Sequence, residues 1–172
     1  MTSECKVDHS RLSALARDFA QRLFEVYPEW ERYASVQVCN ESSMPERDSH
    51  GDLVVIVPPP TGVASALSLL IETDYLGDEV TVYYDHFHDH FSWPPGGPPY
   101  EDWGVELLNQ PLTLIRAILD EELAFKTDFT DDKPAGSTYL RRQDVPPLRQ
   151  RQLPSRHRVR IRSWRGTLDR DY

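Results

Sequence analysis

The first long pattern of apolar positions along the chain has the period of a helix. From Asp8 to Tyr27 the apolar residues recur at the spacing i, i+3, i+4, i+7, which places them on one helical face. These residues are Leu12, Leu15, Ala16, Phe19, Leu23, Val26 and Tyr27. Asp8 or Ser10 can cap the start of such a helix, and Pro28 stops it. The pattern predicts an amphipathic helix over residues 8–27.

Strand-like patterns occupy the next part of the chain. Polar, glycine and proline segments separate four runs rich in β-branched and aromatic residues: "ASVQVCNE", "DLVVIVPPP", "SALSLLIETD" and "EVTVYYDHFHDHF". A few residues around Gly77 join the last two runs, so we expect them to form an antiparallel hairpin. Two further runs near the C-terminus, "STYLRRQ" and "HRVRIRSW", also predict strands. The proline-rich "DVPPLRQRQLPS" between them predicts an exposed loop.

A second helical pattern lies between the two groups of strands. Through "EDWGVELLNQPLTLIRAILDEELAFK" the apolar residues keep near-helical spacing, at Val105, Leu108, Leu112, Ile115, Leu119 and Leu123. Pro111 should kink this segment, or split it into a short helix and a longer one. The preceding "SWPPGGPPYEDW" holds four prolines and cannot form regular structure.

The order of these elements predicts the fold class. A helix, four strands, a helix and two strands, with tight turns between consecutive strands, are typical of an α+β fold. We expect a mainly antiparallel sheet with the two amphipathic helices packed on one face. A chain of 172 residues predicts a single domain over residues 1–172. The arginine- and proline-rich segment 139–172 is expected to fold onto it.

Composition narrows the setting of the protein. Cys5 and Cys39 are too few for a disulfide framework, and no CxxC pair is present. The N-terminal sequence lacks the basic and apolar regions of a secretory signal, and no apolar run has the length of a membrane span. We therefore expect a cytoplasmic protein that does not contact membranes.

Charge is divided unevenly along the chain. Residues 1–138 contain 25 Asp and Glu against 9 Lys and Arg, a formal charge of −16, whereas residues 139–172 contain 3 acids and 10 arginines, a charge of +7. The acidic part repels phosphate, so we expect no nucleic acid among the partners. The arginines of the tail alternate with Val159, Ile161 and Ser163, which indicates either a charge-protected edge strand or a row of arginines offered to an acidic partner.

Candidate chemistry is concentrated in "TVYYDHFHDHFSWPP", which holds three of the six histidines. On a single strand, Tyr84, His86, His88 and His90 would share one face. Three imidazoles suit zinc, copper or nickel, but residues two apart on a strand lie roughly 6.5–7 Å apart at Cα, too far for all three rings to reach one ion. No HExxH motif or cysteine cluster completes a site. We expect no metal and no other cofactor.

The sequence also lacks the signatures of other enzymes. GxSxG, a suitable Cys–His spacing and a phosphate-cradling glycine loop are all absent. We therefore expect no catalysis and interpret the histidine-rich strand as a solvated face, which can also bind a protein. A metal-dependent hydrolase that uses His86, His88 and His90 remains the enzymatic alternative, and a cytosolic structural or adaptor domain is a third hypothesis.

The second half of the chain resembles a known group of proteins. The segments "TVYYDHFHDHFSW", "ILDEELAF" and "RIRSWRGTLDRDY" are similar to segments of immunity proteins from bacterial polymorphic-toxin and contact-dependent growth inhibition systems. The matching residues are His86, His88, Phe91, Ser163, Trp164 and Gly166. The resemblance implies a cytoplasmic protein that binds and blocks one cognate toxin domain without chemistry of its own.

We expect that toxin domain to have a basic binding face, because opposed charge speeds association with an acidic protein. Aromatic residues and arginine are favoured as anchors at protein interfaces. The predicted partner-binding residues are Tyr84, His86, His88, Trp93, Trp164, Arg158, Arg160 and Arg162.

Overall fold

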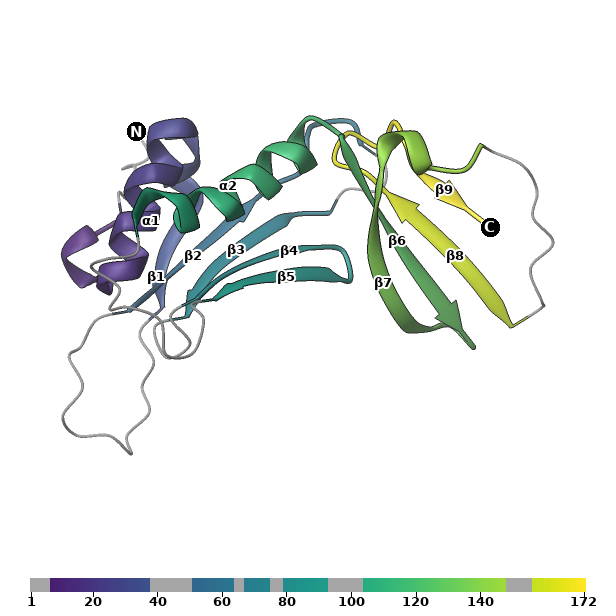
Figure 1. Cartoon of the computed structure of the whole chain (residues 1–172), viewed down its shortest axis with the longest axis horizontal. Helices are drawn as coiled ribbons and strands as arrows, with labels where there is room; N and C mark the ends of the chain where they lie inside the picture. Colours follow the sequence, from purple (N-terminus) through teal and green to yellow (C-terminus); the bar gives the residue numbers. More distant parts are fainter. Residues whose placement is uncertain (1–6, 38–50, 64–66, 75–78, 93–103, 148–155) are drawn as a thin grey trace. The chain divides into compact units, whose positions relative to one another are not determined.

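The computed structural model describes residues 7–37, 51–63, 67–74, 79–92, 104–147 and 156–172 (Figure 1). The chain forms two compact units. Unit 1 comprises Met1–Val57, Leu70–Val82 and His90–Leu112, and unit 2 comprises Pro58–Leu69, Tyr83–Asp89 and Thr113–Tyr172. Each unit is therefore assembled from segments that lie far apart in sequence. The single domain predicted for residues 1–172 stays a prediction.

The elements confirm an α+β fold with antiparallel sheets. The helices are α1 (Ala14–Val26) and α2 (Gly104–Leu119), and short 3₁₀ turns cover His9–Arg11, Pro28–Tyr33 and Arg142–Asp144. The strands are β1 (Ala34–Gln37), β2 (Asp52–Val57), β3 (Leu69–Asp74), β4 (Glu79–Tyr84), β5 (Phe87–Ser92), β6 (Leu123–Thr130), β7 (Lys133–Arg141), β8 (His157–Arg162) and β9 (Arg170–Asp171). They form one sheet of order β1-β2-β3-β4-β5 and another of order β7-β6-β8-β9.

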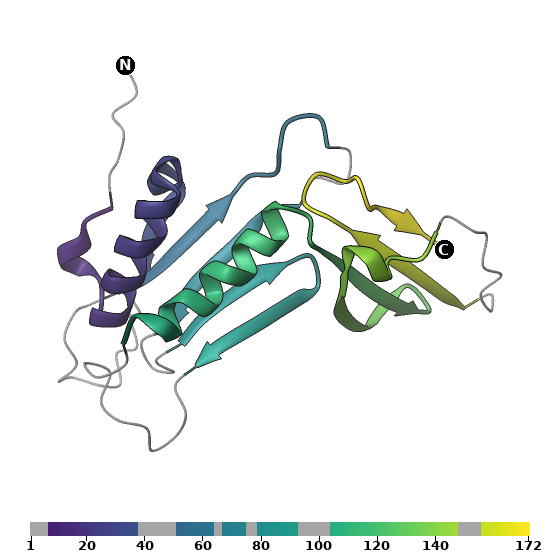
Figure 2. The same ribbon diagram turned by 45° about the horizontal axis from the view of Figure 1, so that its top comes forward.

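The core of unit 1 lies between helix and sheet, as the apolar spacing predicts. Along α1 the residues Leu15, Ala16, Phe19, Ala20 and Leu23 are buried. On β2 every second side chain is buried, at Leu53, Val55 and Val57. Figures 1 and 2 show α1 and the first half of α2 on the same face of the five-stranded sheet.

The first helix begins later than its apolar pattern predicts. Asp8 caps the short 3₁₀ turn by accepting a hydrogen bond from the backbone N–H of Ser10. The α-helical cap is Ser13, whose hydroxyl accepts from the backbone N–H of Ala16 at 3.2 Å. Each cap accepts a hydrogen bond from an N–H group that would otherwise be unpaired. The two caps therefore allow a 3₁₀ turn to be followed directly by the α-helix.

The second helix is shorter than predicted, because it ends at Leu119 and the predicted helical residues from Leu123 onward form β6. Glu121 has a positive φ of 53°. Its N–H donates to Ile118 O, and the next N–H, of Glu122, donates to Ala117 O. These two bonds around a left-handed residue form a Schellman motif, which ends a helix. Pro111 lies inside α2, which is one helix and is not split.

The strand β6 is the reason that the structure has two sheets where we expected one. β6 pairs with β7 through a turn at Asp131 and Asp132, both with positive φ (49° and 61°), and with β8 on its other side. Two successive left-handed residues are the geometry of a tight hairpin turn, and aspartate tolerates it better than most residues. The segment "HRVRIRSW", predicted as a strand, supplies β8.

A close approach at Gly51 joins the start of α1 to the sheet of unit 1. Gly51 forms a parallel bridge with Leu12, and a Cβ added to it would lie 2.5 Å from Val36 Cγ1 and 2.8 Å from Gln37 O. Gly51→Ala is expected to lower the free energy of unfolding by about 2 kcal/mol, since a crowded packed site must shift. Chemical denaturation checks this against Gly136→Ala, where a Cβ meets no atom within 4 Å. Equal stabilities of the two variants would contradict the expectation.

Candidate functional site

The histidine-rich stretch forms a hairpin, which corrects the prediction of one continuous strand. β4 ends at Tyr84, β5 begins at Phe87, and Asp85 at the turn has a positive φ of 57°. The chain therefore reverses direction at Asp85 and His86. As a result, Tyr84 does not lie on the same strand as the histidines that follow. We call the segment Tyr84–Phe87 the hairpin tip; it belongs to unit 2.

The hairpin tip packs against one face of the four-stranded sheet. The strand register places Phe125, Thr127 and Phe129 of β6 on that face. It also aligns them with Tyr139 and Ser137 of β7 and with Arg162, Arg160 and Arg158 of β8.

Aromatic contacts and one hydrogen bond fix the hairpin tip on this face. The rings of Tyr84 and Phe87 lie 5.1 and 4.9 Å from the ring of Phe125, centroid to centroid. Phe87 also meets Tyr139 edge to face at 5.7 Å. The hydroxyl of Ser137 donates to the backbone carbonyl of His86 at 2.7 Å. Residues distant in sequence thus hold the turn in one position.

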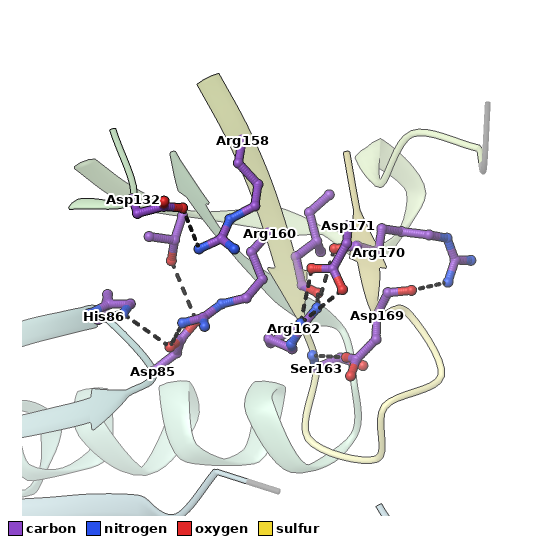
Figure 3. A network of polar contacts seen from close by, with 12 residues as sticks. Asp85, His86, Asp132, Arg158, Arg160, Arg162, Ser163, Asp169, Arg170 and Asp171 are labelled. Atoms are coloured by element: carbon purple, nitrogen blue, oxygen red, sulfur yellow. Dashed lines mark hydrogen bonds and ion pairs between the residues drawn. The ribbon is translucent and has the colours of Figure 1, made fainter. Parts of the chain in front are cut away.

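A buried ion pair lies directly beneath the turn (Figure 3). Only 3% of the Asp85 side chain is exposed, and its carboxylate is paired with the guanidinium of Arg160. The hydroxyl of Thr127 donates to the second carboxylate oxygen at 3.4 Å. Removing either charge would leave the other in a poorly solvated position, so the pair ties β8 to the hairpin.

Around the Asp85–Arg160 ion pair, three side chains are about half exposed to solvent. They are His86 (43%), Tyr139 (48%) and Arg158 (52%), and we call them the tip surface. The nearly buried Phe129 supports two of them. The His86 and Phe129 rings are perpendicular, with their centroids 5.8 Å apart, and the Arg158 guanidinium carbon lies 4.6 Å from the centre of the Phe129 ring. Arg158 also approaches Asp132 at 3.8 Å, a distance of weak pairing between exposed groups (Figure 3).

Near the C-terminus, the residues on which the resemblance to immunity proteins rests belong to a hydrogen-bonded loop around Glu121. The buried carboxylate of Glu121 accepts hydrogen bonds from Ser163 Oγ at 2.7 Å, from the backbone N–H of Arg165 at 2.8 Å, and from the N–H and hydroxyl of Thr167. Burial favours the protonated acid, but these hydrogen bonds outweigh it and hold the pKa of Glu121 below its ordinary value. Gly166 adopts a φ of +73° within the same loop.

Four predicted partner-binding residues lie inside unit 2. Tyr84 is 2% exposed and donates its hydroxyl proton to Ser163 O at 3.0 Å, and burial raises its pKa. Trp164 is 7% exposed and lies against Tyr84. Arg160 is paired with Asp85, and Arg162 is paired with Asp171 at 2.9 Å. All four side chains are largely covered by other residues of unit 2.

The other predicted residues have different positions. His86 and Arg158 belong to the tip surface, whereas Trp93 lies outside the described residues. His88 is exposed on β5, with its ring 5.5 Å from that of Tyr83. His90 Nδ1 lies 2.9 Å from Glu79 and 3.1 Å from the hydroxyl of Thr81.

The histidines thus have different neighbours. Within the described residues, no three His, Cys, Asp or Glu side chains are grouped so that they could hold a metal ion. Chemically, the tip surface offers guanidinium, imidazole and phenol groups that can bind anionic or aromatic groups.

The residues predicted from the sequence to bind a partner did not include Tyr139 or Phe129. Tyr139 lies in the predicted strand "STYLRRQ", but its exposure depends on β7 being an edge strand. Phe129 lies between the predicted second helix and the predicted strand "STYLRRQ", in a segment for which no element was predicted. The alternation of Phe125, Thr127 and Phe129 was the available signal for a strand there.

No family model, curated protein or solved structure matches the chain. None of the helices that the structure describes is long and apolar enough to cross a membrane.

Proposed function

We propose that this protein is a cytoplasmic immunity protein, which neutralises one cognate toxin domain by binding it and performs no catalysis. The observation that carries the proposal is the tip surface. His86, Tyr139 and Arg158 are half exposed and are held in place by packed aromatic rings. Tyrosine and arginine are the residue types most often found as energetic anchors of protein interfaces.

The packing of this surface supports a binding role. Binding costs about 0.5–1.5 kcal/mol for each flexible side chain that becomes ordered. Arg158 is already stacked on Phe129, and the turn that carries His86 is fixed by Ser137 and by the Asp85–Arg160 pair. A partner therefore meets side chains that have lost much of their freedom before contact, which favours a tight complex.

The distribution of charge supports a basic partner. Unit 1 contains 17 Asp and Glu against 6 Lys and Arg, a formal charge of −11, whereas unit 2 contains 11 against 13, a charge of +2. A strongly acidic unit attracts a basic toxin domain from a distance and raises the association rate at low salt. The nearly neutral unit 2 then supplies the contacts that select one partner.

The test is coexpression with the protein encoded by the gene immediately upstream of this one, which the proposal predicts to end in a toxin domain. We expect the cells to survive and the two proteins to purify as a complex. His86→Ala, Tyr139→Ala and Arg158→Ala are each expected to raise the dissociation rate about tenfold, with a smaller change in association rate. Surface plasmon resonance measures both rates.

The matched control is Arg32→Ala. Arg32 is an exposed arginine that also stacks on an aromatic ring, that of Tyr33 at 4.7 Å, but it lies in unit 1. Its loss should leave the dissociation rate unchanged. Cell death without a complex would show that the immunity proposal is wrong. Equal effects of Arg32→Ala and Arg158→Ala would place the binding site elsewhere.

A further inference from the structure

Strand β7 has the features of a docking edge. It is an outer strand of the four-stranded sheet, and its nine residues make it the longest strand of the described chain. All of its residues except Leu140 are exposed. Its first half is irregular, because a bulge leaves Ala135 without a register partner and Pro134 lacks an N–H. From Gly136 to Arg141 the pairing with β6 is regular.

One hydrogen bond shows which backbone groups of β7 point away from β6. The N–H of Arg142 donates to Glu122 O at 2.8 Å, one step beyond the register pair Arg141–Leu123. Backbone groups alternate between the two sides of a strand, so Thr138 and Leu140 also point toward β6. The N–H and C=O groups of Ser137, Tyr139 and Arg141 therefore point away from the sheet, where the Tyr139 carbonyl accepts a hydrogen bond from the Thr138 hydroxyl at 3.5 Å.

The cations at the ends of β7 differ from those in β8 and directly before it. Each of the four arginines Arg156, Arg158, Arg160 and Arg162 forms an ion pair with an aspartate. Within the part of the chain that the structure describes, Lys133, Arg141 and Arg142 form none. They lie at the two ends of β7, roughly 25 Å apart at the usual rise per residue. An uncharged run, "PAGSTYL", separates them.

We infer that an extended segment of the toxin domain, with carboxylates near its ends, adds to β7 as a further strand. The inference rests on the proposed function and identifies how the partner binds. Backbone bonds to Ser137, Tyr139 and Arg141 would supply affinity, and carboxylates opposite Lys133 and Arg141 would fix the register. A toxin domain that is basic as a whole can carry such a segment, because steering depends on total charge and pairing depends on the residues in contact.

A second copy of this chain fits the edge less well. An antiparallel pair of β7 strands centred on Ser137 would place Lys133 opposite Arg141 at both ends. Like charges directly opposite each other destabilise a strand pair, and the uncharged middle offers no compensation. The toxin segment is therefore the occupant that the charges favour.

Amide hydrogen exchange followed by NMR tests this inference directly. In the free protein the amides of Thr138 and Leu140 should exchange slowly and those of Ser137, Tyr139 and Arg141 quickly. In the complex with the toxin domain the second group should also become slow, by about tenfold or more. Contact with side chains alone would not produce this alternating pattern.

A pair of variants at Tyr139 gives a second readout. Tyr139→Pro removes the outward N–H together with the side chain, whereas Tyr139→Ala removes only the side chain; an edge strand tolerates proline at such a position. We expect the proline variant to bind about tenfold more weakly than the alanine variant. Thermal unfolding of both free variants shows whether β7 has remained folded.

The possible results separate the two proposals. If the wild-type complex forms but the amides of Ser137, Tyr139 and Arg141 stay fast, strand addition is wrong and the immunity function stands. If the wild-type chain forms no complex, the immunity function fails and the inference fails with it. If sedimentation shows that the free chain is a dimer with these amides already slow, the occupant of β7 is a second copy and the inference is overturned.

Discussion

Replacing Glu121 with alanine is expected to lower the free energy of unfolding by about 3 kcal/mol, because one buried donor and three partly buried donors lose one charged acceptor. Those donors are the hydroxyls of Ser163 and Thr167 and the N–H groups of Arg165 and Thr167. Together they define the loop between β8 and β9. Urea denaturation followed by tryptophan fluorescence measures the effect, because Trp164 lies in that loop and is buried.

Two further variants separate the carboxylate from the backbone. Glu122→Ala makes the same change one residue later, at an exposed side chain, and should alter stability by no more than about 0.5 kcal/mol. Glu121→Gly loses the carboxylate but relieves the positive φ of 53°, so it should be about 1 kcal/mol more stable than Glu121→Ala. Equal losses at positions 121 and 122 would refute the anchoring role.

The same carboxylate gives stability a pH dependence. The pKa of Glu121 is lower in the folded protein than its ordinary value of 4.5. Its contribution is therefore complete above about pH 4.5 and is lost as the pH falls through the lower folded pKa. The free energy of unfolding, measured with urea between pH 3 and 6, should fall less on acidification in Glu121→Gln than in the wild type.

Breaking the buried Asp85–Arg160 pair should have an effect of similar size. Arg160→Met leaves a buried carboxylate without its cation and is expected to cost about 3 kcal/mol of folding free energy. Adding Asp85→Asn removes that uncompensated charge, and asparagine tolerates the positive φ of the turn, so the double variant should regain part of the loss. Denaturation of the wild type, the two single variants and the double variant gives the coupling energy.

Arg158→Met is the matched control for this experiment. Arg158 stacks on the same ring, Phe129, but its ion pair with Asp132 is exposed and 3.8 Å long. Its removal should cost less than about 1 kcal/mol. If Arg158→Met and Arg160→Met were equally destabilising, or if Asp85→Asn gave no recovery, the ion pair would not be the link between hairpin and sheet.

For the candidate site, the sequence identified residue types more reliably than their environments. The alternation of arginines with Val159 and Ile161 predicts a strand, and β8 is present. The same alternation could not indicate which face a neighbour covers. Arg160 and Arg162 are paired inside unit 2, while Arg158, on the same face, remains half exposed at its rim. The difference depends on where the hairpin tip lies.

The error at the β4–β5 turn has a specific cause. "EVTVYYDHFHDHF" contains neither glycine nor proline, so nothing in its pattern interrupts the strand. The chain nevertheless reverses at Asp85, where a non-glycine residue takes a positive φ. The ion pair with Arg160, 75 residues later, and the hydrogen bond from Ser137 compensate for that conformation.

By itself, the sequence determined the α+β class, the amphipathic helix α1 and most of the strands, because each depends on a periodicity within one segment. Only the tertiary structure decided that α2 ends before β6, that β6 forms a second sheet with β7 and β8, and that Tyr84 and Trp164 are buried. Glu121 illustrates the reason. A glutamate after a leucine-rich helix favours continuation of the helix, but a loop more than 40 residues away supplies the donors that hold its carboxylate. Such contacts leave no local pattern, because the two partners acquire their roles only when the fold brings them together.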